Sequence, residues 1–232
     1  MKKSNFPLIL LLIFILFLGC SGIMLSKNQK NNIQIKDIYI FIDGIEGGPT
    51  VSKVIAEFPK EISSVENNNL WKITTAGVER KIKNIYISDK MGNKAAKSAY
   101  ITFDLETETV KGGFSYIASP FKYNTEIFMN QWVSNYIVNI KGGTLKIENK
   151  TFSVADKTKD SINNRIVPDT ELFSFRDAIS GDYINPITKK TDNLKLHLAA
   201  YEPSNLKSGS RKPLIVWLHG QGEGGTDPDI AI

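Results

Sequence analysis

Residues 99–105 read Ala-Tyr-Ile-Thr-Phe-Asp-Leu, an alternation in which every second side chain is apolar. Successive side chains of a β-strand point to opposite faces of a sheet, so a period of two marks a strand with one face in a core. The odd-numbered residues of this stretch, from Ala99 to Leu105, are therefore expected to face a core. Thr102 and Asp104 are expected to face water.

Similar short segments lie on both sides of this one, separated by turn-forming residues such as Gly47-Gly48-Pro49 and Lys141-Gly142-Gly143. The other predicted strands are 38–42, Val51–Phe58, Leu70–Thr74, Ile82–Ser88, Trp132–Ile140 and Leu145–Ile147, and the alternating stretch itself is predicted as the strand Tyr100–Glu106. No helix of three turns is expected in this half. Seven short strands predict a β-sandwich over residues 37–156.

Composition limits the function. The 232 residues are 41% hydrophobic and 23% charged, which is ordinary for a globular protein, and a net charge of +5 is too small to argue for a nucleic-acid partner. One cysteine excludes an internal disulfide, and with two histidines it gives no cluster of the kind a structural zinc site needs. We expect no metal and no cofactor.

The N-terminus has the features of an export signal. Lys2 and Lys3 precede an apolar run over 6–19, and Leu18-Gly19-Cys20-Ser21 resembles a bacterial lipoprotein lipobox. That resemblance implies a signal peptide over 1–19, lipidation of Cys20, a lipidated tether over 20–36 and an extracytoplasmic, lipid-anchored protein with membrane lipid as a partner. An uncleaved N-terminal anchor and an incidental leader cysteine are the alternatives.

The pattern changes after the predicted sandwich. Residues 157–171 are polar and are predicted to be a linker. Leu194–Tyr201 alternates as a half-exposed strand, whereas Pro213–Leu218 is apolar at every position, which predicts a strand buried on both faces of a helix-covered sheet. Residues 172–232 are therefore expected to be the start of an α/β domain that is incomplete here.

A glycine-rich loop follows that apolar run: His219-Gly220-Gln221-Gly222-Glu223-Gly224-Gly225-Thr226-Asp227. As a dinucleotide fingerprint it fails, because no apolar helix follows and Glu223 would lie where a pyrophosphate must bind. A glycine-rich turn without chemistry is a second possibility. The third is an oxyanion-hole loop, since such a turn after a buried strand can aim a backbone N–H at a substrate oxygen.

Two stretches resemble parts of known esterases. Residues 212–227 resemble the start of the catalytic domain in extracellular esterases of the polyhydroxybutyrate-depolymerase and feruloyl-esterase-like branch, and 196–203 resemble the strand before it. Residues 48–58 resemble the opening of the Ig-like domain that precedes the hydrolase domain in some of them. The resemblance implies a mostly β chain, an Ig-like β-sandwich followed by the first strands of a truncated α/β-hydrolase domain. It also implies an oxyanion loop of His219, Gly220, Gln221 and Gly222, with the N–H of Gln221 as donor.

The catalytic residues of that family are not present. The 232 residues contain no G-x-S-x-G nucleophile elbow and no acid and histidine after one. His219 corresponds to a loop-supporting histidine in the family and not to the base, and His197 lies on the polar face of its predicted strand. We assign no role to Ser115, Ser119 or Ser180, and we expect the chain to be inactive by itself.

Two functions remain open. The chain is either the N-terminal fragment of an extracellular, membrane-tethered carboxylic ester hydrolase, or a complete surface lipoprotein acting as a non-enzymatic binding module. In the first case an ester substrate is expected only with a completed catalytic domain. In the second, an aromatic face could bind a partner, although such stretches are more often core: Phe114, Tyr116, Phe121, Tyr123, Phe128 and Trp132. The exposed edge that Pro213–Leu218 would leave favours the fragment.

Overall fold

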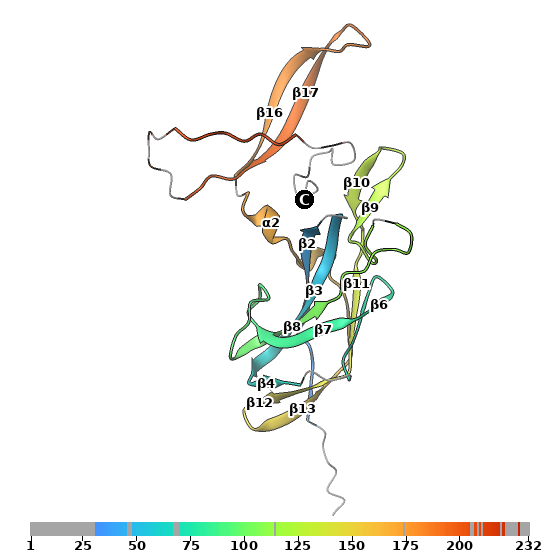
Figure 1. Cartoon of the computed structure of the whole chain (residues 1–232), viewed down its shortest axis with the longest axis vertical. Helices are drawn as coiled ribbons and strands as arrows, with labels where there is room; N and C mark the ends of the chain where they lie inside the picture. The colour runs from blue at the N-terminus through green and yellow to red at the C-terminus, as the bar shows by residue number, and fades with distance from the viewer. Residues whose placement is uncertain are drawn as a thin grey trace, which may run out of the picture. The chain divides into compact units, whose positions relative to one another are not determined.

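A computed structural model describes residues 31–45, 48–66, 70–113, 115–173, 175–204, 207, 209, 211–218, 220 and 227 of the chain. The predicted signal peptide, Cys20 and most of the predicted tether lie outside these residues. Within them, the secondary structure is almost entirely β (Figure 1). No helix among them is long and apolar enough to cross a membrane.

The larger sheet of the sandwich has five strands in the order β15-β2-β3-β8-β7 (Figure 1). β2 pairs antiparallel with β3, β3 with β8 and β8 with β7, whereas β15 lies parallel to β2. The bounds are β2 Asp37–Ile45, β3 Gly48–Ile62, β7 Ile82–Ser88, β8 Ser98–Leu105 and β15 Arg165–Ile166.

The remaining strands form two four-stranded sheets and two hairpins. One sheet has the order β14-β11-β5-β6 and the other β1-β13-β12-β4. Their strands are β14 Lys157–Asp160, β11 Ile137–Lys141, β5 Lys72–Thr75, β6 Val78–Arg80, β1 Asn32–Ile33, β13 Lys150–Val154, β12 Thr144–Ile147 and β4 Ser64–Val65. The hairpins are β9 Phe121–Asn124 with β10 Met129–Trp132, and β16 Phe175–Ile184 with β17 Thr191–Ala200. The described helices are short: η2 Ile162–Asn164 and α2 Pro168–Glu171.

One apolar core lies between the sheets. Ile101, Phe103 and Leu105 of β8 are buried in it, as the alternation predicts. Trp71 packs edge-on against Phe103, with ring centroids 5.0 Å apart. Isoleucines of β5 and β11 complete the same cluster from the facing sheet. The mostly β sandwich predicted from the sequence is thus the observed fold.

The other face of β8 differs from the expectation, because Thr102 is fully buried. Its hydroxyl donates to Ser88 Oγ at 2.7 Å, and a second cluster of Phe41, Ile55 and Ile166 covers this side of the sheet. The turn between β7 and β8 packs there too, with Met91 against the cluster and Gly92 close to Ile55. Alternation within one strand carries no information on what a later segment will cover.

The predicted strand Trp132–Ile140 is two strands in two sheets. β10 ends at Trp132, and β11 begins at Ile137 after an irregular stretch. Tyr136, in that stretch, is fully buried and its hydroxyl donates to Ala118 O at 2.6 Å. The anchored tyrosine lies where the chain leaves one sheet for the other.

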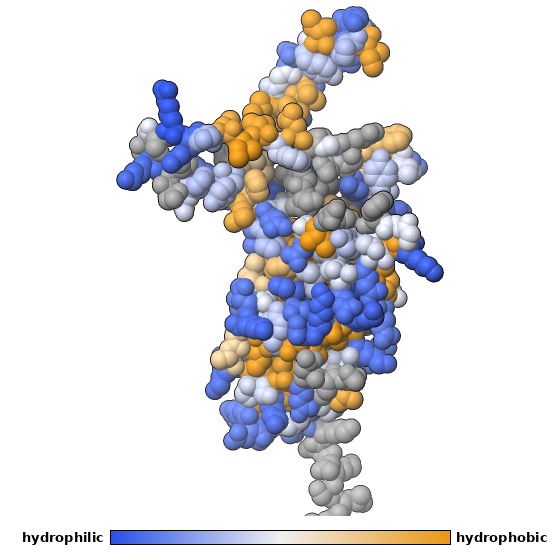
Figure 2. Space-filling model, in the orientation of Figure 1, coloured by the Kyte–Doolittle hydropathy of each residue, from blue (hydrophilic) through white to orange (hydrophobic). Residues whose placement is uncertain are grey.

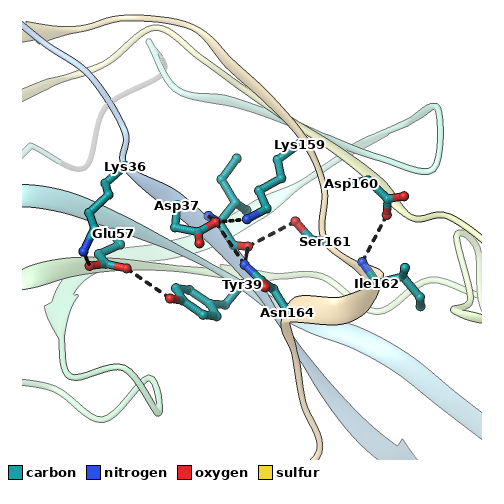
Figure 3. A network of polar contacts seen from close by, with 10 residues as sticks. Lys36, Asp37, Tyr39, Glu57, Lys159, Asp160, Ser161, Ile162 and Asn164 are labelled. Atoms are coloured by element: carbon teal, nitrogen blue, oxygen red, sulfur yellow. Dashed lines mark hydrogen bonds and ion pairs between the residues drawn. The ribbon is translucent and has the colours of Figure 1, made fainter.

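The segment predicted as a linker, 157–171, is largely part of the sandwich. β14 pairs with β11, β15 pairs with β2, and Ile162, Ile166 and Val167 are buried. The reason is a network of polar contacts between this segment and β2 (Figure 3). Polar composition therefore signals a hydrogen-bonded seam here and not a solvated connection.

Asp37 is the centre of this network (Figure 3). Its carboxylate accepts hydrogen bonds from Lys159 Nζ, from Asn164 Nδ2 at 2.9 Å and from the N–H of Ile38 at 2.7 Å. Partial burial raises the pKa of Asp37, but these three donors outweigh burial, and the net pKa is below its ordinary value. Ser161 Oγ and Asn164 Nδ2 also donate to the carbonyl of Ile38, at 3.2 and 3.1 Å.

A second group of polar contacts, between β3 and the start of β2, lies beside Asp37 in Figure 3. Glu57 of β3 is buried, and it accepts hydrogen bonds from Lys36 Nζ and from the Tyr39 hydroxyl, the latter at 3.0 Å. Burial and this bond to a carboxylate raise the pKa of Tyr39 to about 12. The tyrosine is thus held in its neutral, donating form.

Arg80 is a buried cation at the end of β6, with 4% of its surface exposed. Its guanidinium donates to Thr75 Oγ1 at 3.0 Å, to Val51 O at 3.2 Å and to Glu106 O at 2.9 Å. Burial lowers the pKa of Arg80 from its ordinary value. One side chain thus connects β5, β3 and the end of β8.

The apolar run Pro213–Leu218 contradicts the prediction of a buried strand. It forms no strand, and Leu214, Ile215 and Trp217 are 85%, 89% and 82% exposed. An interior strand needs neighbours on both edges and cover on both faces. None of the described strands pairs with this run. The predicted strand Leu194–Tyr201 is confirmed as β17.

We predict that Arg80→Lys lowers the free energy of unfolding by about 2 kcal/mol, because one ammonium cannot replace a fork that donates to three separate acceptors. Urea denaturation measures the change. The control is Lys81→Met at the next position, which removes only exposed ion pairs with Glu106 and Glu108 and should cost less than about 1 kcal/mol. Equal losses in the two variants would contradict the role of Arg80.

We also predict that Asp37 makes the sandwich sensitive to acid. A carboxyl with a lowered folded pKa stabilises the protein above its unfolded pKa of about 3.9, and this stabilisation is lost as the pH falls through the folded pKa. Asp37→Asn should therefore cost roughly 1 to 2 kcal/mol at pH 7 and flatten the decline of Tm below about pH 4. Asp182→Asn, on β16, is the matched control. An unchanged acid limb in Asp37→Asn would refute the assignment.

Candidate functional site

The residues predicted for the oxyanion loop are only partly described. Gly220 is exposed and lies in no strand or helix. His219, Gln221 and Gly222 lie outside the described residues, as does Cys20. The other described residue of this loop is Asp227, at its end, and Asp227 contacts the sandwich.

Asp227 contacts the sandwich through Trp132. The indole Nε1–H donates to Asp227 Oδ2 at 3.1 Å, across 95 residues of chain. An N–H donated to a carboxylate is a charge-assisted hydrogen bond, stronger than one between neutral groups. The contact joins the Ig-like half of the chain to the segment that follows Pro213–Leu218.

The position of Trp132 is fixed by its own hairpin. It lies opposite Phe121 in the register of β10 with β9, and the two rings pack edge-to-face, with centroids 4.2 Å apart. Trp132 also packs against the main core from its half-buried position. A side chain held on both sides loses little rotamer freedom when it binds a partner.

Arg165 covers the face of the same indole. Its guanidinium carbon lies 4.6 Å from the ring centroid, and its Nη1 donates to Ile162 O at 3.1 Å. An aromatic ring is negative on its face and positive at its edge. A cation over the face and a carboxylate at the N–H edge therefore both fit the charge distribution of Trp132.

Arg165 also lines a shallow open depression beside this cluster. The other lining residues are Asn163, Val167, Thr170, Glu171 and Arg176. Arg176 of β16 donates to Thr170 O of α2 at 3.3 Å. The depression thus lies where the sandwich meets the β16–β17 hairpin, and its charges are mixed.

The remaining candidates among the described residues have exposed or structural positions. His197, the one histidine among them, is exposed on β17. Ser119 donates to Pro49 O at 3.1 Å, which is a structural contact. In the part of the chain that is described, no three His, Cys, Asp or Glu side chains gather as metal ligands would. In the cluster of Trp132, Arg165 and Asp227, the indole N–H of Trp132, whose face Arg165 covers, binds the carboxylate of Asp227.

Sequence reasoning found part of this cluster. Trp132 and Phe121 belong to the aromatic stretch that was a candidate for either core or binding face, and both are half-buried. Tyr116 is also half-buried, Tyr123 and Phe128 of the β9–β10 hairpin are 46% and 56% exposed, and Phe114 lies outside the described residues. Arg165 was missed, because it belongs to the segment predicted as a linker.

The three sheets around one core, with β15 parallel to β2, define an Ig-like β-sandwich. Residues 37–153 match the sequence model of the esterase Ig-like N-terminal domain, and the chain belongs to that family. The predicted resemblance of this half to an Ig-like domain of esterases is therefore confirmed.

A solved structure extends the comparison beyond that domain. The fold is similar to that of a crystal structure of a thermostable esterase, with a TM-score of 0.60 and 18% sequence identity, over 84% of this chain and 50% of that one. The chain thus spans half the length of that esterase. No curated protein matches the chain in sequence.

Proposed function

We propose that the chain is the N-terminal portion of an extracellular, membrane-tethered carboxylic ester hydrolase, with the Ig-like sandwich followed by the first strands of an α/β-hydrolase domain. The observation that carries the proposal is the uncovered apolar surface after the sandwich. Pro213–Leu218 lies in no strand or helix and is exposed, in a segment whose sequence resembles the start of such a catalytic domain.

The β16–β17 hairpin adds to that surface. Its register puts Ile179 opposite Leu196 and Gly181 opposite Leu194, so that apolar side chains share one face while Lys195 and His197 lie on the other. Ile179, Leu194 and Leu196 are 61%, 46% and 57% exposed, and Figure 2 shows apolar residues gathered on this hairpin. Large uncovered apolar patches mark surfaces that another layer covers. The rest of a hydrolase domain would supply that layer.

In the proposed enzyme the loop 219–222 supports acyl transfer. The backbone N–H of Gln221, between Gly220 and Gly222, would donate to the oxyanion of the tetrahedral intermediate, and His219 would support the loop. The substrate class is a carboxylic ester, by similarity to the polyhydroxybutyrate-depolymerase and feruloyl-esterase-like branch. The nucleophile must come from a G-x-S-x-G motif that the 232 residues do not contain.

The anchor is proposed from the sequence of the leader. Lipidation of Cys20 would hold the enzyme at the outer side of a membrane, with residues up to 36 as the tether. An uncleaved leader would give the same location with a different anchor.

The test is to read the coding region after the Ile232 codon and to express the chain with and without its extension. We expect a G-x-S-x-G motif followed by an acid and a histidine, and hydrolysis of p-nitrophenyl butyrate by the extended protein only. Alanine at the motif serine should abolish turnover. Cys20→Ala should move the activity from the membrane fraction to the soluble fraction.

An extension without the motif, or ester hydrolysis by the 232-residue chain alone, would contradict the proposal. The first result would favour the second candidate function, a surface lipoprotein that binds a partner. The exposed side chains at the tip of the β9–β10 hairpin, Tyr123, Ile127 and Phe128, are the observation in its favour.

A further inference from the structure

We propose that Trp132 is a positioning residue through which the Ig-like sandwich holds the segment that leads out of the glycine-rich loop. The inference rests on the proposed function only for its meaning in catalysis. The contact itself stands on the hydrogen bond from Trp132 Nε1 to Asp227 Oδ2 at 3.1 Å.

On the sandwich side of this contact, two neighbouring side chains hold the indole of Trp132 in place. Phe121 fixes one side of the indole at a centroid distance of 4.2 Å, and Arg165 lies over its face at 4.6 Å. Arg165 is itself fixed, because it is the first residue of β15 and donates to Ile162 O. The indole N–H is therefore presented by a rigid surface.

Charge complementarity identifies the segment as the occupant. Residues 222–232 contain Glu223, Asp227 and Asp229 and no lysine or arginine. On the sandwich side, Arg165 lies over the indole that Asp227 contacts, and the adjoining depression is lined by Arg165 and Arg176 against one acid, Glu171. Asp227 is the acid of the segment that is described in contact with Trp132.

The consequence for the proposed enzyme is a fixed loop end. Asp227 lies six residues after Gln221, so holding its carboxylate limits the positions that the oxyanion donor can take. Preorganised donors are what make an oxyanion hole effective. Trp132 touches no reacting atom, and its effect passes through Asp227.

The test measures hydrogen exchange on the 232-residue chain in peptides covering residues 219–230. Trp132→Phe keeps an aromatic ring and removes the N–H, and Asp227→Ala removes the acceptor. Each should speed exchange in these peptides about tenfold, as expected for loss of one charge-assisted bond. The double variant should be no faster than either single one, because the two changes remove the same bond. Asp227→Asn, which keeps an acceptor oxygen, should lie between wild type and Asp227→Ala.

Trp217→Phe is the matched control, since this tryptophan is 82% exposed and should leave the rates unchanged. Exchange in β8 reports the integrity of the sandwich. If Trp132→Phe also speeds exchange in β8, that variant has disturbed the sandwich itself. Asp227→Ala is then the variant that tests the contact, because Asp227 is not part of the core. Additive effects in the double variant, or wild-type rates in Asp227→Ala, would overturn the inference. The measurement needs no catalysis, so its result is separate from the outcome of the ester assay.

Discussion

The hydrogen bonds to Asp37 are the constraint from which the rest of the structure follows. They attach residues 159–164 to β2, beside which the next strand, β15, pairs. Arg165 is the neighbour of Asn164 and is the first residue of β15. Its guanidinium covers the face of the Trp132 indole. A half-buried carboxylate of the sandwich is thus linked, through Asn164 and Arg165, to the contact between Trp132 and Asp227.

The strands of the sandwich were predictable because each is a short, mostly apolar run between turn residues, although β3 is buried at five consecutive positions, 54–58, and not at every second one. β2, β3, β7, β8 and β12 were found in this way. What period two cannot tell is which later segment covers a second face, so Thr102 was expected in water and is buried under the cluster of Phe41, Ile55 and Ile166. The linker prediction differs from the structure for a related reason. The polar partners of Lys159, Ser161 and Asn164 lie 120 or more residues earlier in the chain. Composition cannot tell a polar side chain that bonds to such a partner from one that bonds to water.

The candidate site was predictable only in its parts. The aromatic stretch marked Trp132, and the glycine-rich motif ended at Asp227, but no pattern within either one points to the other 95 positions away. The apolar run Pro213–Leu218 predicted a buried strand, and the structure instead has it exposed and outside any strand. Burial of such a run depends on neighbouring strands, and none of the described ones pairs with this run.

The parallel pairing of β15 with β2 has a mechanical consequence. The chain enters the five-stranded sheet at the start of β2 and leaves it at the end of β15, and these two strands run in the same direction. Tension between the residues before and after the domain therefore pulls the two strands past each other, along their length. The ladder, the carboxylate of Asp37 and the carbonyl of Ile38 carry such a load together, and they must give way at once and not one after another. A force applied at the two ends of this sheet therefore loads the pairing of β15 with β2 in shear and does not peel it open from one end.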